Sequence, residues 1–264
     1  MKTFITIAFL LFSIKLYPQS YDKNLGKSSE IKRKDDVAIK WNKTLNQADF
    51  AVKLDSLNTI QKNLDLSLIL AYDSSSNPYL SKFTGAFGEN YQRTDLLLQS
   101  VKLEGNQTYS IQFLCYRNKI IDTLRGQMNL NSAYNILKEP FDVYLYSFNY
   151  KLFNSDTSFY IQGINAISFY LENEKVNNFW FDDGTFRDYI RTFVGSYADY
   201  QLKKSGNFIF ATEASGLYNH LPFCDELYYT SKDCEEYYNI KSKYLKSGWQ
   251  DYEKPSKYFK WWQK

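Results

Sequence analysis

The chain has 264 residues and a formal net charge of +3, a length that suits one sizeable domain or two small ones. A charge so close to neutral indicates no basic surface field, so it argues for neither nucleic acid nor an anionic membrane as a partner. Aromatic residues make up 19% of the chain, with 24 Tyr and 20 Phe. Because these side chains favour strands and half-buried surfaces, the composition predicts a β-rich protein.

Residues 1–20 have the pattern of a cleavable secretory signal peptide. Lys2 precedes an uncharged apolar run that is shorter than the roughly 20 residues a membrane-spanning helix needs, and Pro18 then interrupts any helix. The alternative is a buried N-terminal strand or helix. No Cys lies near the end of the apolar run, and no later run is long enough to cross a bilayer. We therefore expect an exported, soluble monomer, periplasmic or secreted, without a transmembrane anchor.

The next segments change from polar to helical in pattern. Residues 21–36 are polar and Lys-rich, which predicts a flexible lead-in. Across residues 37–72, Phe50, Leu54, Leu57 and Leu64 recur at helical spacing, which predicts one or two helices. A Ser-rich stretch that ends at Pro78 then breaks the pattern.

Residues 79–264 carry strand signals joined by polar turns. Residues 107–116 and 141–153 alternate along the strand, and 107–116 place Tyr109, Ile111, Phe113 and Cys115 on one face. Residues 159–171 are predicted to return as a further strand, interrupted by Gly163. The fold class predicted is therefore mainly β, an antiparallel meander that closes into a barrel-like, calycin- or lipocalin-like domain, with a sandwich as the alternative. The irregular, aromatic C-terminal segment is expected to pack across the sheet or to plug one end.

Three segments carry a resemblance to known proteins. Phe83–Phe87 and Phe193–Tyr197 share the form Phe-x-Gly-x-aromatic, which places both rings and the Gly on one strand face. The blocks Phe83–Arg93, Phe193–Tyr197 and Tyr244–Tyr252 resemble those of a group of uncharacterised exported bacterial proteins, and the Gly-centred form is similar to one in lipocalin-type barrels. The group usually has Trp where this chain has Tyr197. The resemblance implies export and a β-rich domain, and it transfers no catalytic residue.

The cysteines allow one disulfide. In an oxidising compartment two of the three can pair, and Cys224 and Cys234 are predicted as the couple because they flank a short polar loop. The alternative is two free thiols. Cys115 lies in a strand-like run and is predicted to be a buried thiol.

The sequence gives little support for catalysis. His220 is the only histidine, which rules out a histidine-rich zinc site, and there is no phosphate loop, dinucleotide Gly pattern or Cys-x-x-Cys. We therefore predict no catalytic residue, no metal site and no cofactor. Paired carboxylates leave one enzymatic alternative, a hydrolase acting on envelope glycans. The candidate acids are Asp182, Asp183, Asp188, Asp225, Glu226, Asp233, Glu235 and Glu236.

The leading functional hypothesis is a non-enzymatic binding protein. Glu89 and Arg93 flank Tyr91 in the first block, an arrangement that suits either a structural cross-strand pair or a polar ligand. The predicted ligand-binding residues are Glu89, Tyr91, Arg93, Tyr197 and Trp249. We expect the partner to be a small apolar or amphipathic ligand or a cell-envelope component. A purely structural or interaction role is a third possibility. The question that separates these hypotheses is whether the interior of the barrel is hollow or packed.

Overall fold

The computed structural model describes residues 43, 51–54, 64–71, 82–117, 119–137, 139, 142–179, 190–212, 224–229, 236–240 and 242–250, with only the backbone for 224–229 and 236–240. The chain divides into two units, Met1–Asp35 and Asp36–Lys264, and all described residues belong to the second. The predicted signal peptide over 1–20 and the lead-in over 21–36 lie outside the described residues.

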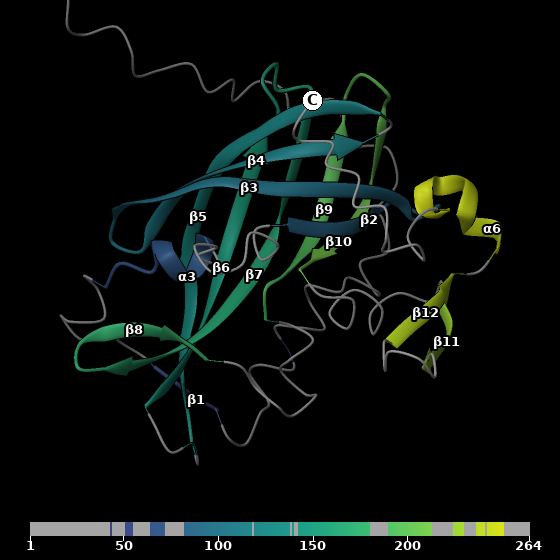
Figure 1. Ribbon diagram of the computed structural model, residues 1–264. Helices are drawn as coiled ribbons and strands as arrows, with labels where there is room; N and C mark the ends of the chain where they lie inside the picture. The colour runs from purple at the N-terminus through teal and green to yellow at the C-terminus, as the bar shows by residue number, and fades with distance from the viewer. Residues whose placement is uncertain are drawn as a thin grey trace, which may run out of the picture. The chain divides into compact units, whose positions relative to one another are not determined.

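Eight strands of a ten-stranded antiparallel sheet close into a ring (Figure 1). They are β2 (Lys82–Phe87), β3 (Gln92–Gly105), β4 (Thr108–Arg117), β5 (Ile120–Ile136), β6 (Val143–Phe153), β7 (Phe159–Glu172), β9 (Thr192–Asp199) and β10 (Lys204–Ala211). Each of these strands pairs with the next along the chain, and β10 pairs with β2 to complete the ring. The predicted mainly β, antiparallel fold is therefore confirmed.

Shorter elements extend or accompany the ring. Strands β1 (Ala51–Lys53) and β8 (Lys175–Asn178) pair with the ends of β5 and β7, and β11 (Cys224–Tyr229) pairs with β12 (Glu236–Ile240) in a separate two-stranded sheet. The helical elements are α3 (Ser67–Ala71), α6 (Ser242–Tyr244) and η3 (Leu245–Trp249).

The region predicted to be helical, 37–72, also contains a strand. Within its described residues, α3 is a short helix at the end of the region, but Ala51–Lys53 form strand β1. A tertiary contact explains the strand. β1 pairs in antiparallel register with Tyr134–Ile136, the last residues of the long strand β5. Helical spacing of apolar residues is a weaker determinant than a ready sheet edge.

Two phenylalanines of β10 explain why the Phe-x-Gly-x-aromatic form occurs twice. In the sheet register each of them has a Gly on one side and a Phe on the other: Phe210 lies opposite Gly85 and Phe193, and Phe208 opposite Phe87 and Gly195. The paired Phe rings stack, with centroids 4.6 and 4.9 Å apart. A Cβ at Gly85 would lie 2.4 Å from the Cβ of Phe210. The glycine therefore leaves the space that the Phe210 side chain needs.

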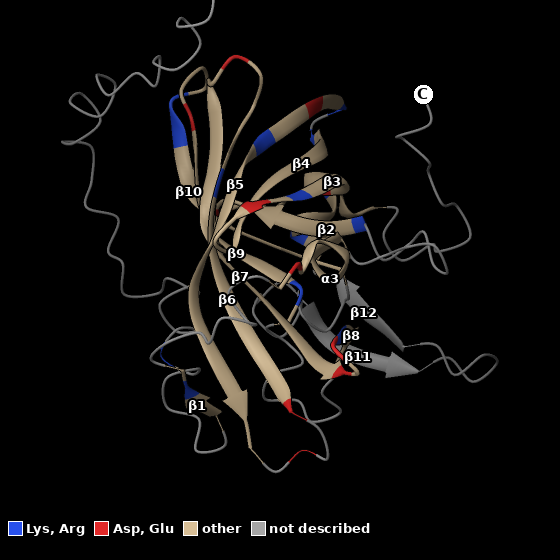
Figure 2. Cartoon of the chain, turned by 90° about the vertical axis from the view of Figure 1, so that its left-hand side faces the viewer, with Lys and Arg blue, Asp and Glu red and all other residues tan. Residues whose placement is uncertain are grey.

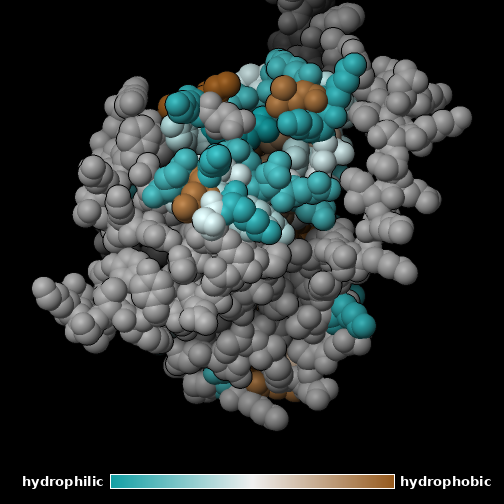
Figure 3. All heavy atoms as spheres, turned by 90° about the vertical axis from the view of Figure 1, so that its right-hand side faces the viewer, coloured by the Kyte–Doolittle hydropathy of each residue, from teal (hydrophilic) through white to brown (hydrophobic). Residues whose placement is uncertain are grey.

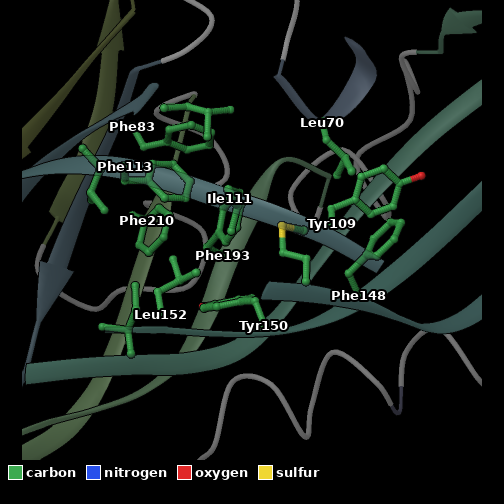
Figure 4. Close-up of a cluster of buried hydrophobic side chains, with 14 of the residues drawn as sticks. Leu70, Phe83, Tyr109, Ile111, Phe113, Phe148, Tyr150, Leu152, Phe193 and Phe210 are labelled. Atoms are coloured by element: carbon green, nitrogen blue, oxygen red, sulfur yellow. The ribbon is translucent and has the colours of Figure 1, made fainter. Parts of the chain in front are cut away.

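Aromatic side chains meet across the interior of the ring. Strands β4 and β9 lie on opposite sides, with three strands between them in either direction, yet the rings of Phe113 and Phe193 are 5.6 Å apart. Phe83 lies 5.3 Å from Phe193 and 5.6 Å from Phe113, and all three rings are at most 1% exposed. Figure 4 shows these rings pointing toward one another from different strands. The interior at this level is therefore filled by edge-to-face aromatic packing.

Helix α3 packs into the end of the ring where β3 turns into β4. Its side chains Ile69 and Leu70 belong to the same buried cluster as the interior rings, and Figure 4 shows Leu70 beside Tyr109. The Tyr109 hydroxyl donates to Gln107 Oε1 at 2.7 Å and accepts from the Leu66 amide at 3.2 Å. Burial raises the pKa of Tyr109 to about 12. This hydrogen-bonded tyrosine ties the helix to the ring.

Replacing a second interior tyrosine, Tyr146, by Phe is expected to stabilise the folded protein. The Tyr146 hydroxyl is buried and has no hydrogen-bond partner among the described residues, and burial raises its pKa. Since an unsatisfied buried hydroxyl costs free energy, Tyr146→Phe should raise the free energy of unfolding by about 1 kcal/mol. The matched control is Tyr109→Phe, which removes a bonded hydroxyl and should lower it by about 1 kcal/mol. Urea unfolding measures both, and equal losses would contradict the assignment.

Candidate functional site

Three of the predicted ligand-binding residues meet on the outer face of the ring. The Trp249 indole Nε1 donates to the Tyr91 carbonyl at 2.6 Å, and the Arg93 guanidinium carbon lies 5.9 Å from the Trp249 ring centroid. Trp249 is 0% exposed and belongs to a second buried cluster, formed with outward-facing side chains such as Val194 and Ile209. Trp249 is therefore inaccessible to a ligand from solvent.

Further contacts make this group an anchor for the segment 242–250. Tyr91 adopts a positive φ of 47° in the turn between β2 and β3, and its ring packs edge-on against Tyr244 at 5.0 Å. The Gln92 side-chain amide donates to the Ser247 carbonyl at 2.9 Å. Arg93 forms an ion pair with Asp95 at 3.1 Å, and Glu89 lies exposed on the turn. These contacts hold the segment against the start of β3.

The last of the five predicted residues, Tyr197, lies on the opposite face of the sheet. Its ring packs inside, 5.4 Å from Phe87 and 6.0 Å from Phe159. Burial is the main cause that raises the pKa of its hydroxyl, opposed by the nearby charge of Arg117. The structure therefore brings Tyr91, Arg93 and Trp249 together and separates Tyr197 from them.

An ion pair that sequence analysis did not predict crosses the ring near its turns. Arg117 Nη2 of β4 and Asp199 Oδ2 of β9 are 3.1 Å apart, although these strands lie on opposite sides of the ring. The side chains are 23% and 7% exposed, and the Arg117 guanidinium carbon lies 4.1 Å from the Phe159 ring centroid. Asp199 Oδ1 also accepts from the Leu202 amide at 2.9 Å. The pair thus closes the interior at this end and joins the β4–β5 turn to the β9–β10 turn.

Exposed aliphatic and basic side chains occupy these two joined turns. Ile120 is 67% exposed, Ile121 45% and Leu202 56%. Exposed lysines lie beside these aliphatic residues: Lys119 in the first turn, Lys203 in the second, and Lys204 at the start of β10. We call the six residues the turn rim. Figure 2 shows charged residues along the turns at the upper end of the ring, and Figure 3 shows hydrophobic side chains among hydrophilic ones at the top of another face.

The predicted disulfide and most candidate acids lie outside what the structure can describe. Cys234, Asp182, Asp183, Asp188, Asp233 and Glu235 are outside the described residues, as is His220, and the side chains of Cys224, Asp225, Glu226 and Glu236 are not described. Among the residues that the structure describes, no group of three or more His, Cys, Asp and Glu could hold a metal ion. Within the same residues, no helix is long and apolar enough to cross a membrane.

Cys115 is a free, buried thiol, as its position in an alternating strand predicted. Burial raises its pKa to about 12, and the thiolate is the reactive form. We expect native protein at pH 8 to leave Cys115 unmodified by iodoacetamide, whereas protein in urea should react fully, as peptide mapping by mass spectrometry would detect. Modification of the native thiol as fast as the unfolded one would contradict this burial.

Comparison of the chain with family models, with curated proteins and with solved structures gives no match.

Proposed function

We propose that the protein is exported and acts without catalysis, by binding a component of the cell envelope on the outside of its ring. The packed interior is the observation that carries this proposal. Phe113 and Phe193 meet across the ring at 5.6 Å, and the ion pair of Arg117 with Asp199 crosses it nearer the turns. Such packing favours the outer surface over the interior as the place where a partner binds, and so favours the envelope component over a small enclosed ligand.

We also propose that the ring is a calycin-like barrel and that the chain is related to the exported bacterial group that its three blocks resemble. The up-and-down order of the eight ring strands supports the first point. The contacts of the blocks support the second, because Phe83 of one block packs against Phe193 of another, and Trp249 of the third hydrogen-bonds to Tyr91 of the first.

Sedimentation with envelope fragments tests the proposed binding. Purified protein would be mixed with fragments isolated from bacteria and centrifuged, and the bound fraction measured against protein concentration. We expect saturable binding that survives washing. Protein that stays in the supernatant at every concentration would overturn the proposal. N-terminal sequencing of the protein recovered from the periplasm or medium tests export separately, with a start near Tyr21 expected.

A further inference from the structure

We propose that the turn rim docks on the surface of an anionic lipid bilayer. The inference rests on the proposed function and names the chemistry of the envelope component. Its starting point is the exposure of Ile120, which begins β5 directly after the β4–β5 turn, and of Leu202 in the β9–β10 turn, which are 67% and 56% exposed. Aliphatic side chains on turn tips gain free energy by entering the headgroup region of a membrane, where their apolar surface leaves water.

The lysines of the rim supply the complementary charge. Lys119, Lys203 and Lys204 are exposed and form no ion pair with any described residue. A long Lys side chain can place its ammonium group on lipid phosphates while the neighbouring aliphatic side chain inserts. Each lysine close to an anionic surface contributes about 1 kcal/mol of binding free energy, about fivefold in affinity, so the contributions of the three lysines add up.

Three carboxylates at this end of the ring have partners within the protein, whereas a fourth, Glu89, is exposed on the β2–β3 turn. Asp199 is paired with Arg117, and Asp122 accepts from the Thr123 amide at 2.7 Å. Asp156 accepts from the Ser158 amide at 2.9 Å and from Gln201 at 3.0 Å, and these hydrogen bonds from Ser158 lower its pKa. Only Asp199 is neutralised by a cation, and the other three carboxylates keep their charge, so the attraction to lipid phosphates must come from the lysines directly beside Ile120 and Leu202.

The geometry holds both tips in one rigid frame. The ion pair between Arg117 and Asp199 joins the strand ends that carry the two turns, and Asp199 also fixes the Leu202 amide. Lys119 and Lys203 both adopt positive φ values, 67° and 52°, at the tight points of their turns. A rim that is ordered before binding loses little conformational entropy when it meets a surface.

Vesicle sedimentation with the full chain tests this inference. The vesicles would contain phosphatidylglycerol and phosphatidylcholine in equal parts, or phosphatidylcholine alone. We expect binding to the first, weak binding to the second, and loss of binding in high salt because salt screens the lysine charges. Replacing one rim lysine by Glu should weaken binding by about fivefold or more, and Leu202→Ser by about tenfold.

Matched variants distinguish an effect of the turn rim on vesicle binding from an effect of net charge or of exposed apolar surface elsewhere. The triple variant K119E, K203E and K204E has the same net charge as K53E, K102E and K175E, whose lysines are exposed elsewhere on the protein. Leu68→Ser controls for Leu202→Ser, because Leu68 is 67% exposed but lies on α3. Only the rim variants should lose binding.

Three results would overturn the inference: no sedimentation with anionic vesicles, equal binding to neutral vesicles, or equal losses in rim and control variants. If the protein sediments with envelope fragments but not with anionic vesicles, the bilayer inference fails while the proposed function stands. If it sediments with neither, both fail.

Discussion

Replacing Phe193 by Ala should lower the free energy of unfolding by about 3–5 kcal/mol, the range for removing a fully buried aromatic side chain. The Phe193 ring is 1% exposed and lies within 5.6 Å, between centroids, of four other rings, those of Phe83, Phe113, Tyr150 and Phe210. Removing this side chain leaves a void where side chains from opposite strands of the β-sheet ring meet. Urea unfolding followed by tryptophan fluorescence measures the change.

An aromatic side chain at the periphery, that of Phe153, provides the control. Phe153 ends strand β6, is only partly buried and packs on Tyr160 at 5.8 Å, so Phe153→Ala should cost about 1 kcal/mol. If Phe193→Ala does not fold, Phe193→Leu, with an expected cost of about 1–2 kcal/mol, takes its place. A Phe193 variant no less stable than the Phe153 variant would show that the interior is loosely filled.

The second large effect is expected at a pair of glycines that face each other on β7 and β9 and leave no room for a Cβ. Gly163 and Gly195 face each other in the sheet register, and a Cβ on Gly163 would lie 1.9 Å from the Val194 carbonyl oxygen. Tyr150, which is the neighbour of Gly163 on β6, extends over them and donates to that same carbonyl at 3.3 Å. Gly163→Ala must therefore separate the strands and disturb the tyrosine, at a cost of about 3 kcal/mol or more.

Gly206→Ala is the matched comparison, because it makes the same change in strand β10. The nearest atom to a Cβ there is Cε1 of the Tyr197 ring at 3.2 Å, which a small side-chain shift accommodates. We expect its effect to stay below about 1 kcal/mol, partly offset by the lower entropy of the unfolded chain. Thermal unfolding followed by circular dichroism compares the two, and equal midpoints would contradict the close approach of β7 and β9.

Much of the ring could be predicted from local pattern. Alternation in 107–116 correctly predicted that Tyr109, Ile111, Phe113 and Cys115 share one face, because side chains on a strand repeat every two residues, and the structure shows that this is the inner face. The antiparallel meander followed from the spacing of such strands and their polar turns. The short strand β1 was missed because its pairing with β5 is a tertiary contact that helical spacing obscures.

The candidate site was harder to predict, because the turns and the closure of the ring determine which face each side chain lies on and which distant residues form pairs. Phe87 pairs with Gln92 across the β2–β3 turn, which places Tyr91 and Arg93 on the outer face, whereas the pairing of β9 with β7 and β10 places Tyr197 on the inner face. A turn of different length would reverse this, since a one-residue shift moves every side chain to the other face. The pair of Arg117 with Asp199 spans 82 residues of sequence, and only closure of the ring brings them together.

Titration of the native protein with palmitate, followed by calorimetry, tests the central claim that the interior is packed and that partners bind outside. We predict no one-to-one binding by the native protein. Saturable one-to-one binding of palmitate by the native protein would contradict the packed interior, and so the account.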